Sequence, residues 1–177
     1  MSVIASSAEA IWNTTAGGDS HAATPAQSGM GTYSTSGSPS NLFDNTNSTT
    51  YSSRGNSVNG TNAIAGLNTG FYVTTSACRT VLTGFSFIPI RGGSSRDPFT
   101  VTIEGSNASD LTKGSNWVLL YNGPTGLQYI VNRNLEGERQ NFTNTRIFSN
   151  YRFLITNKRG ISDFVSYSGV NLYGYSA

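Results

Sequence analysis

The sequence predicts an all-β domain, an antiparallel jelly-roll sandwich, and three of its features support this. Charged residues make up only 11% of the 177 residues, while Gly, Ser, Thr and Asn are abundant. Short apolar or alternating runs recur from residue 71 to residue 173, and turn-forming segments separate them. None of these runs has the 3.6-residue period of an amphipathic helix. Short strands joined by many turns are therefore expected.

The expected strands cover residues 71–73, 81–90, 99–104, 117–121, 129–131, 151–156 and 170–173. Within 99–104, Phe99, Val101 and Ile103 alternate with polar residues, so period-two geometry places them on one face of a half-buried strand. Segments 91–98, 105–107, 122–126 and 157–160 are rich in residues that accept turn geometry.

One domain is expected, because 177 residues suffice for one core of ordinary size and not for two. Residues 38–177 form the expected sandwich. Residues 1–37 hold few large apolar side chains among Ser, Gly, Ala and Thr. We expect this segment to be a polar arm that packs on the domain or on neighbouring copies.

The charge pattern argues against several partners. The net charge is +2 and the Lys and Arg residues are scattered along the chain, so nucleic acid is not expected as a partner. Residues 1–10 lack a basic segment followed by a long apolar stretch, and no eighteen apolar residues run together. We expect neither a classical secretion signal nor a membrane span, which leaves intracellular locations, a vacuole included, compatible with the sequence.

The residue types that catalysis needs are not grouped in this sequence. His21 is the one histidine and lies in the polar arm, far from any predicted scaffold for a nucleophile. Glu136 and Glu138 would form a carboxylate pair, but Arg133 and Arg139 beside them favour a solvated charge cluster. The sequence has no Walker motif, dinucleotide fingerprint or Cys/His metal spacing. A non-enzymatic protein is expected.

Cys78 is the one cysteine, so an internal disulfide is excluded. Two alternatives stay open for it. It is either a buried thiol or one half of a disulfide between two copies of the chain.

An ordered set of segments resembles the discoidin, or coagulation-factor type C, family of galactose-binding-like domains. The segments are SPSNLFD (38–44), TYSS (50–53), TGFSF (83–87), FTVTIEGSN (99–107), WVLLY (117–121), YRFLI (151–155) and VNLYG (170–174). They span about three quarters of the chain, and their order carries the resemblance. It implies an eight-stranded jelly roll whose loops at one end recognise sugars, lipid head groups or proteins.

The resemblance also implies a structural calcium ion between one turn and the last strand. The turn offers Asp44, Asn47 and Thr49 as oxygen ligands. This chain departs from the family pattern, because many relatives have Asp-Gly where it has Asp44-Asn45, and a glutamate where it has Gly169 and Asn171. Calcium prefers six to eight oxygens that include carboxylates. The alternative is that Asp44 and Asn47 only cap the turn.

Glycan binding needs aromatic surfaces and planar polar groups on loops. Tyr51, Arg54, Arg91 and Arg96 fall on predicted loops and are the candidate ligand-binding residues. For Tyr51 the alternative is a buried ring that packs the base of its loop. Trp117 begins an apolar run and is expected in the core.

Two functions are compatible with these features. Low charge, exposed strand edges, the polar arm and the single cysteine favour a structural protein that assembles with itself into a crystal, filament or large oligomer. A discoidin-like single domain with one cysteine and no secretion signal also resembles the crystal-forming discoidin-like proteins of zygomycete fungi. The alternative is a carbohydrate-binding module or lectin, because fold alone does not decide function.

Overall fold

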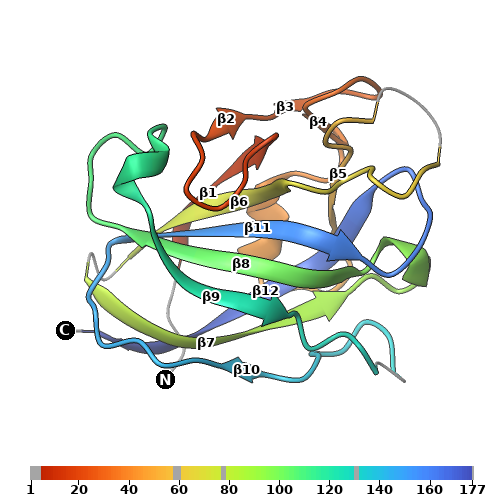
Figure 1. Cartoon of the computed structure of the whole chain (residues 1–177). Helices are drawn as coiled ribbons and strands as arrows, with labels where there is room; N and C mark the ends of the chain where they lie inside the picture. The colour runs from red at the N-terminus through yellow and green to blue at the C-terminus, as the bar shows by residue number, and fades with distance from the viewer. Residues whose placement is uncertain (1–4, 58–60, 77–78, 130–131, 177) are drawn as a thin grey trace.

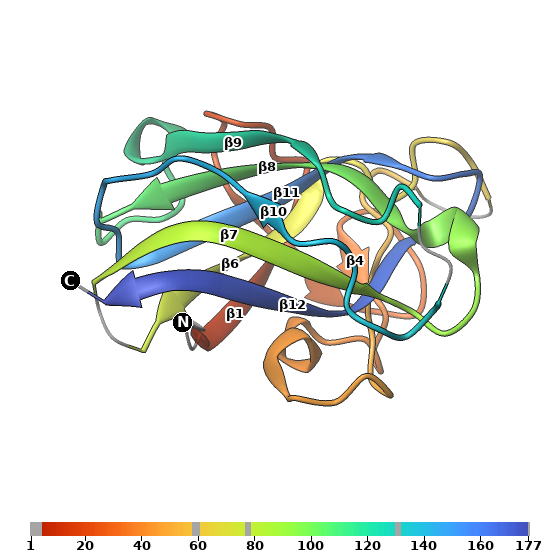
Figure 2. The ribbon, with the colours of Figure 1, turned by 90° about the horizontal axis from the view of Figure 1, so that it is seen from below.

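Two six-stranded sheets face each other in this computed structural model, which describes residues 5–57, 61–76, 79–129 and 132–176. One sheet has the strand order β2-β1-β6-β11-β8-β9 and the other β10-β7-β12-β5-β4-β3. Figure 2 shows β7, β12 and β10 in front of strands of the first sheet. Among the named strands of the described residues, only β3 and β4 pair in parallel. The predicted antiparallel β-sandwich is confirmed.

The strands are β1 (Ala5–Trp12), β2 (His21–Ala22), β3 (Thr24–Pro25), β4 (Thr32–Tyr33), β5 (Tyr51–Ser53), β6 (Thr69–Thr75), β7 (Thr80–Pro89), β8 (Pro98–Ser106), β9 (Val118–Pro124), β10 (Gln140–Asn141), β11 (Asn150–Lys158) and β12 (Val165–Ser176). Short 3-10 helices η1 (Pro39–Phe43), η2 (Ser94–Arg96) and η3 (Gly114–Asn116) lie in the connections (Figure 1). No helix within the described ranges is long and apolar enough to cross a bilayer.

Six of the expected strands overlap β6, β7, β8, β9, β11 and β12. The strand expected at 129–131 is wrong at Tyr129, which lies in a turn and is 91% exposed. Residues 130–131 lie outside the described ranges. Gly126, in a left-handed conformation at φ 85°, turns the chain away from β9 just before this point.

The amino-terminal segment contributes to both sheets. β1 pairs with β6 from Ala5 to Ile11, while β3 and β4 extend the edge of the second sheet beyond β5. Ala10 and Ile11 are buried. These pairings place the segment that the sequence predicts as an arm against the sandwich of its own chain.

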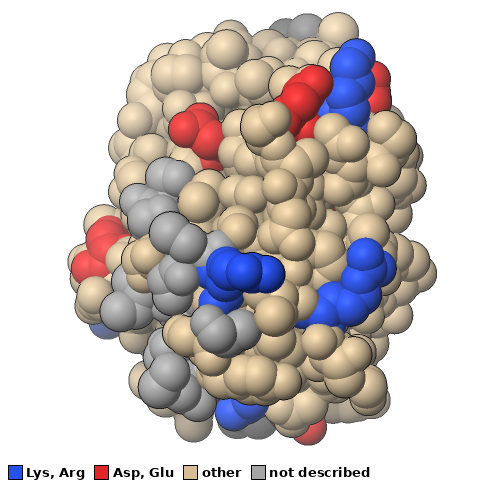
Figure 3. Space-filling view, turned by 90° about the vertical axis from the view of Figure 1, so that its left-hand side faces the viewer, with Lys and Arg blue, Asp and Glu red and all other residues tan. Residues whose placement is uncertain are grey.

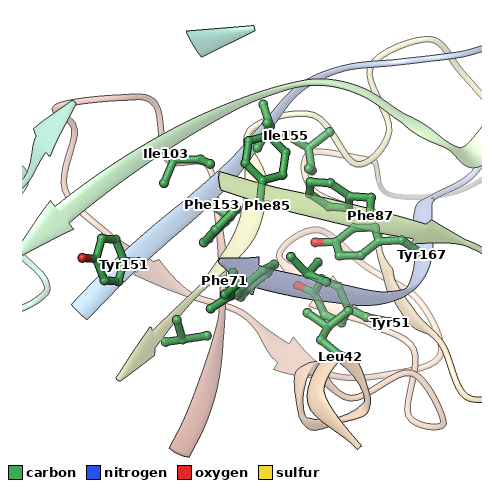
Figure 4. Packing of buried hydrophobic residues seen from close by; sticks show 14 of the residues in the cluster. Leu42, Tyr51, Phe71, Phe85, Phe87, Ile103, Tyr151, Phe153, Ile155 and Tyr167 are labelled. Atoms are coloured by element: carbon green, nitrogen blue, oxygen red, sulfur yellow. The ribbon is translucent and has the colours of Figure 1, made fainter. Parts of the chain in front are cut away.

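Aromatic rings fill the space between the two sheets (Figure 4). Phe71 of β6 and Phe153 of β11 stack with centroids 5.1 Å apart, and Phe85 meets Phe153 edge-on. Tyr167 of β12 packs edge-on against Phe87. These rings come from both sheets, so the layers are held by apolar burial and aromatic packing.

Strand β8 differs from its prediction in one respect. Val101 and Ile103 face the core as expected, but Thr102 and Glu104 on the opposite face are buried as well. Glu104 accepts hydrogen bonds from the Arg152 side chain and from the backbone N–H of Gly17, at 2.8 and 2.7 Å. The connection between β1 and β2 therefore covers this part of the outer face, which local alternation does not reveal.

Candidate functional site

Three loops meet at one end of the sandwich, on the right-hand side of Figure 1. Their described residues are 54–57 and 61–68, 90–97, and 158–164, and we call the surface that these residues form the loop end. Backbone hydrogen bonds join Asn62 and Ser162 in both directions, at 3.1 and 3.3 Å. The amide of Gly160 donates to the carbonyl of Ser95 at 3.0 Å. The loops thus hold one another in place.

A buried carboxylate anchors the loop end. Asp97 has no exposed surface and accepts two hydrogen bonds from the guanidinium of Arg133, at 2.6 and 3.0 Å. It accepts a third from Nε of Arg159 at 3.2 Å. The hydrogen bond with Asp97 raises the pKa of Arg133 above its usual value. This bidentate geometry is among the strongest polar contacts available to a protein, and it ties the 90–97 loop to two neighbouring segments.

A buried lysine ties the other two loops together. Nζ of Lys158 donates to the carbonyls of Asn62 and Ser162, both at 2.9 Å, and to Oγ of Ser162 at 3.1 Å. Burial lowers the pKa of Lys158 to about 8, against the opposing influence of Asp163. These three acceptors occupy the donors of the ammonium group, so Lys158 positions the loops and is not free to bind a ligand.

Two arginines gather around one aromatic ring at the loop end. The guanidinium carbon of Arg54 lies 4.1 Å from the centroid of Phe164, and that of Arg96 lies 5.5 Å from it. Arg96 also pairs with Asp163 at 3.1 Å, and Nη2 of Arg54 donates to the carbonyl of Gln27 at 3.0 Å. Contact with an aromatic ring fixes a guanidinium while leaving donors at its edge accessible.

Apolar side chains stand beside these arginines. Ile64 and Ile161 are 59% and 68% exposed, and the backbone bridge between Asn62 and Ser162 brings their loops together. Planar donors beside exposed apolar groups suit a ligand with hydroxyl or anionic groups on a partly apolar ring.

The structure brings together two of the four predicted ligand-binding residues, Arg54 and Arg96. Arg91 lies on the same loop as Arg96 and is exposed. Tyr51 is a correction, because it lies in β5 with no exposed surface and its hydroxyl donates to the carbonyl of Gly70 at 3.0 Å. Its ring packs against Tyr167 in the core, which is the packing role considered as its alternative.

Phe164 is the residue that the sequence analysis missed. It lies immediately before β12 and has no apolar neighbour at alternating positions, so periodicity gives no sign of it. Trp117 is buried, as expected, but its partner is the guanidinium of Arg152, 4.6 Å from the ring, on the outer face of the sheet.

The turn predicted to bind calcium brings Asp44 and Thr49 together. Asp44 accepts from the amide of Thr46 at 3.0 Å and from the hydroxyl of Thr49 at 2.6 Å. Asn47 instead donates its side-chain amide to the carbonyl of Asn134 at 3.0 Å. A cavity of about 380 Å³ separates this turn from β12.

The oxygen donors at this turn do not fit calcium well. Asp44 is the one carboxylate of the turn, and both of its oxygens already accept hydrogen bonds within it. No group of three or more His, Cys, Asp or Glu residues within the described ranges is arranged to hold a metal. Calcium needs more oxygens, carboxylates among them. Adding calcium to the metal-free protein tests whether this turn binds the ion.

The remaining predicted residues lie elsewhere. Glu136 accepts from Ser86 at 2.6 Å and from the hydroxyl of Tyr173. Burial raises the pKa of Glu136, but hydrogen bonds from Ser86, Tyr173 and Asn171 outweigh it and hold this pKa below its usual value. His21 is exposed in β2. Cys78 lies outside the described residues.

Solved structures with a similar fold include carbohydrate-binding modules. A family 32 module from Clostridium perfringens, in complex with GalNAc-β-1,3-galactose, matches 98% of this chain and 99% of its own with a TM-score of 0.63 and 12% identity. Another from the same organism, in complex with galactose, matches 94% of this chain and 91% of its own with a TM-score of 0.58 and 14% identity. A chitosan-binding module from Paenibacillus sp. IK-5 matches 97% of each chain with a TM-score of 0.55 and 16% identity.

No protein-family profile and no curated relative matches the chain. The likeness to solved modules therefore establishes the fold, a galactose-binding-like β-sandwich, over nearly the whole chain. It does not carry over ligand-binding residues at this level of identity.

Proposed function

We propose that this domain is a non-catalytic carbohydrate-binding module whose loop end contacts the glycan. The observation that carries the proposal is the convergence of Arg54 and Arg96 on Phe164, on the loops of a sandwich whose structural neighbours are carbohydrate-binding modules. The guanidinium groups supply planar donors for sugar oxygens. The ties through Asp97 and Lys158 preorganise the loops, which lowers the entropic cost of binding.

A glycan array probed with the labelled protein tests this proposal, followed by calorimetry on the strongest ligand. We expect Arg96→Ala to weaken binding at least tenfold, because it removes one planar donor group and the contact with Phe164. Arg79→Ala is the matched control. Arg79 is exposed and precedes β7, ten residues long, at the opposite end of the sandwich.

Two results would count against glycan binding at the loop end. One is a folded protein that binds no glycan on the array. The other is an Arg79→Ala variant that loses as much affinity as Arg96→Ala, since the contacts would then lie elsewhere.

Self-association, the first function that the sequence favours, ranks second. The compared structures give it no support, nor do they support a relation to crystal-forming proteins. Between Ala5 and Ile11, moreover, the polar arm is paired with β6 of its own chain. Light scattering at high concentration, with and without reductant and with Cys78→Ser, tests it. A protein that stays monomeric throughout excludes assembly.

A further inference from the structure

Folding separates the charges of this chain. The loop end carries Arg54, Arg91, Arg96, Lys158 and Arg159 against two acidic residues, Asp97 and Asp163. The rest of the chain keeps six of the eleven Lys and Arg residues but seven of the nine Asp and Glu residues. Building on the proposed glycan site, we propose that the loop end selects acidic glycans, those with carboxylate or sulfate groups, over their neutral counterparts.

The two acidic residues at the loop end are already neutralised. Asp97 is fully buried between Arg133 and Arg159, and Arg133 enters from a fourth segment and adds a further positive charge. Asp163 pairs with Arg96 at 3.1 Å. Neither carboxylate therefore stands free to repel an incoming anion.

Two arginines at this end, Arg91 and Arg54, have a side-chain donor without an acceptor among the described residues. Arg91 is exposed and makes no hydrogen bond or ion pair with any residue that the structure describes. Nε of Arg54 is buried and likewise lacks a hydrogen-bond partner within the described ranges. The side chain of Arg96 is 39% exposed beside its contact with Asp163. A planar carboxylate or a sulfate on a bound sugar would supply an acceptor for the exposed donors of Arg91 and Arg96.

Two further cationic side chains at this end are held in place by hydrogen bonds. Lys158 and Arg159 donate to backbone carbonyls of Asn62, Ser162 and Gln128 and cannot turn toward a ligand. They still contribute to the electrostatic potential over the loops. The opposite end of the sandwich, facing the viewer in Figure 3, shows Lys and Arg side chains interspersed with Asp and Glu.

An array that prints each acidic glycan beside its neutral parent tests the proposal. We expect the acidic member of the best pair to bind at least tenfold more tightly in 50 mM salt. This preference should shrink in 500 mM salt, because salt screens exposed charges.

Three variants show whether the preference comes from the loop end. Arg91→Ala removes a side chain with no structural partner and should reduce the preference for the acidic member at least threefold. Arg96→Lys keeps the charge but loses the planar fork, so it too should reduce the preference. Arg79→Ala makes the same charge change at the opposite end and should leave it unaltered.

Each contrary outcome has a distinct meaning. Equal binding of acidic and neutral members overturns the proposal but leaves glycan binding intact, whereas binding of neither overturns both. The proposal is also overturned if Arg79→Ala reduces the preference for acidic glycans as much as Arg91→Ala does, because the net charge of the protein would then explain the preference. Binding to phosphatidylserine vesicles without binding to any glycan would assign the positive loops and exposed isoleucines to a membrane surface.

Discussion

Replacing Asp97 with asparagine tests whether one buried carboxylate holds the loop end together. The substitution keeps the size of the side chain and removes its charge. Asp97 accepts three hydrogen bonds from two guanidinium groups, and a hydrogen bond to a charged group contributes about 1.5–3 kcal/mol. Because the side chains of Arg133 and Arg159 are 23% and 28% exposed, water replaces part of the loss. We expect a net cost of about 3 kcal/mol.

Urea denaturation and thermal melting measure this cost. A domain of this size loses about 2–4 °C of Tm per kcal/mol, so Asp97→Asn should lower Tm by about 6–12 °C and still fold. Asp163→Asn is the matched control. Its pair with Arg96 is partly exposed on both sides, so its loss should cost less than about 1 kcal/mol.

The reasoning is refuted if Asp97→Asn costs under about 1 kcal/mol, or no more than Asp163→Asn, because burial would then not distinguish the two ion pairs. If the destabilised Asp97→Asn variant binds glycan as tightly as the wild type, glycan recognition does not depend on the stability that Asp97 gives to the loop end.

Three further predictions concern other parts of the sandwich. Glu104→Gln removes the carboxylate that pairs with the fully buried guanidinium of Arg152, so urea denaturation should show a loss of about 3–5 kcal/mol in the free energy of unfolding. The double variant with Arg152→Met should lose less than the sum of the two single losses. Strictly additive losses would contradict the coupling. Because the pKa of Lys158 is lowered to about 8, the folded state releases this proton before the unfolded state does, so wild-type stability relative to Lys158→Met should rise by about 1 kcal/mol between pH 8 and pH 9. A flat difference for Lys158→Met over this range would disprove the burial effect. Adding 5 mM CaCl₂ after dialysis against EDTA should leave Tm unchanged, since Asp44 is the one carboxylate of its turn. A calcium-dependent rise that Asp44→Asn abolishes would show that the turn binds the ion.

The sequence by itself predicts the all-β class and most of the long strands. This succeeds because apolar alternation and turn residues are local signals, as in the run from Phe99 to Ile103. The amino-terminal strand β1 lacks that signal. Its alanines and serines form a strand because β6 offers an unpaired edge, which is a tertiary condition.

The candidate site depends still more on the tertiary structure. Arg54, Arg96 and Phe164 are far apart in the sequence, and only the closure of the sandwich places them around one ring. The arginines and lysines are scattered along the chain, yet five of them gather on three loops at one end. Tyr51 shows the converse, because a tyrosine between polar residues suggests a loop platform, whereas strand pairing with β12 turns its ring into the core. Local patterns determine which segments are extended, while the position of a charged or aromatic side chain depends on neighbours that are distant in the sequence.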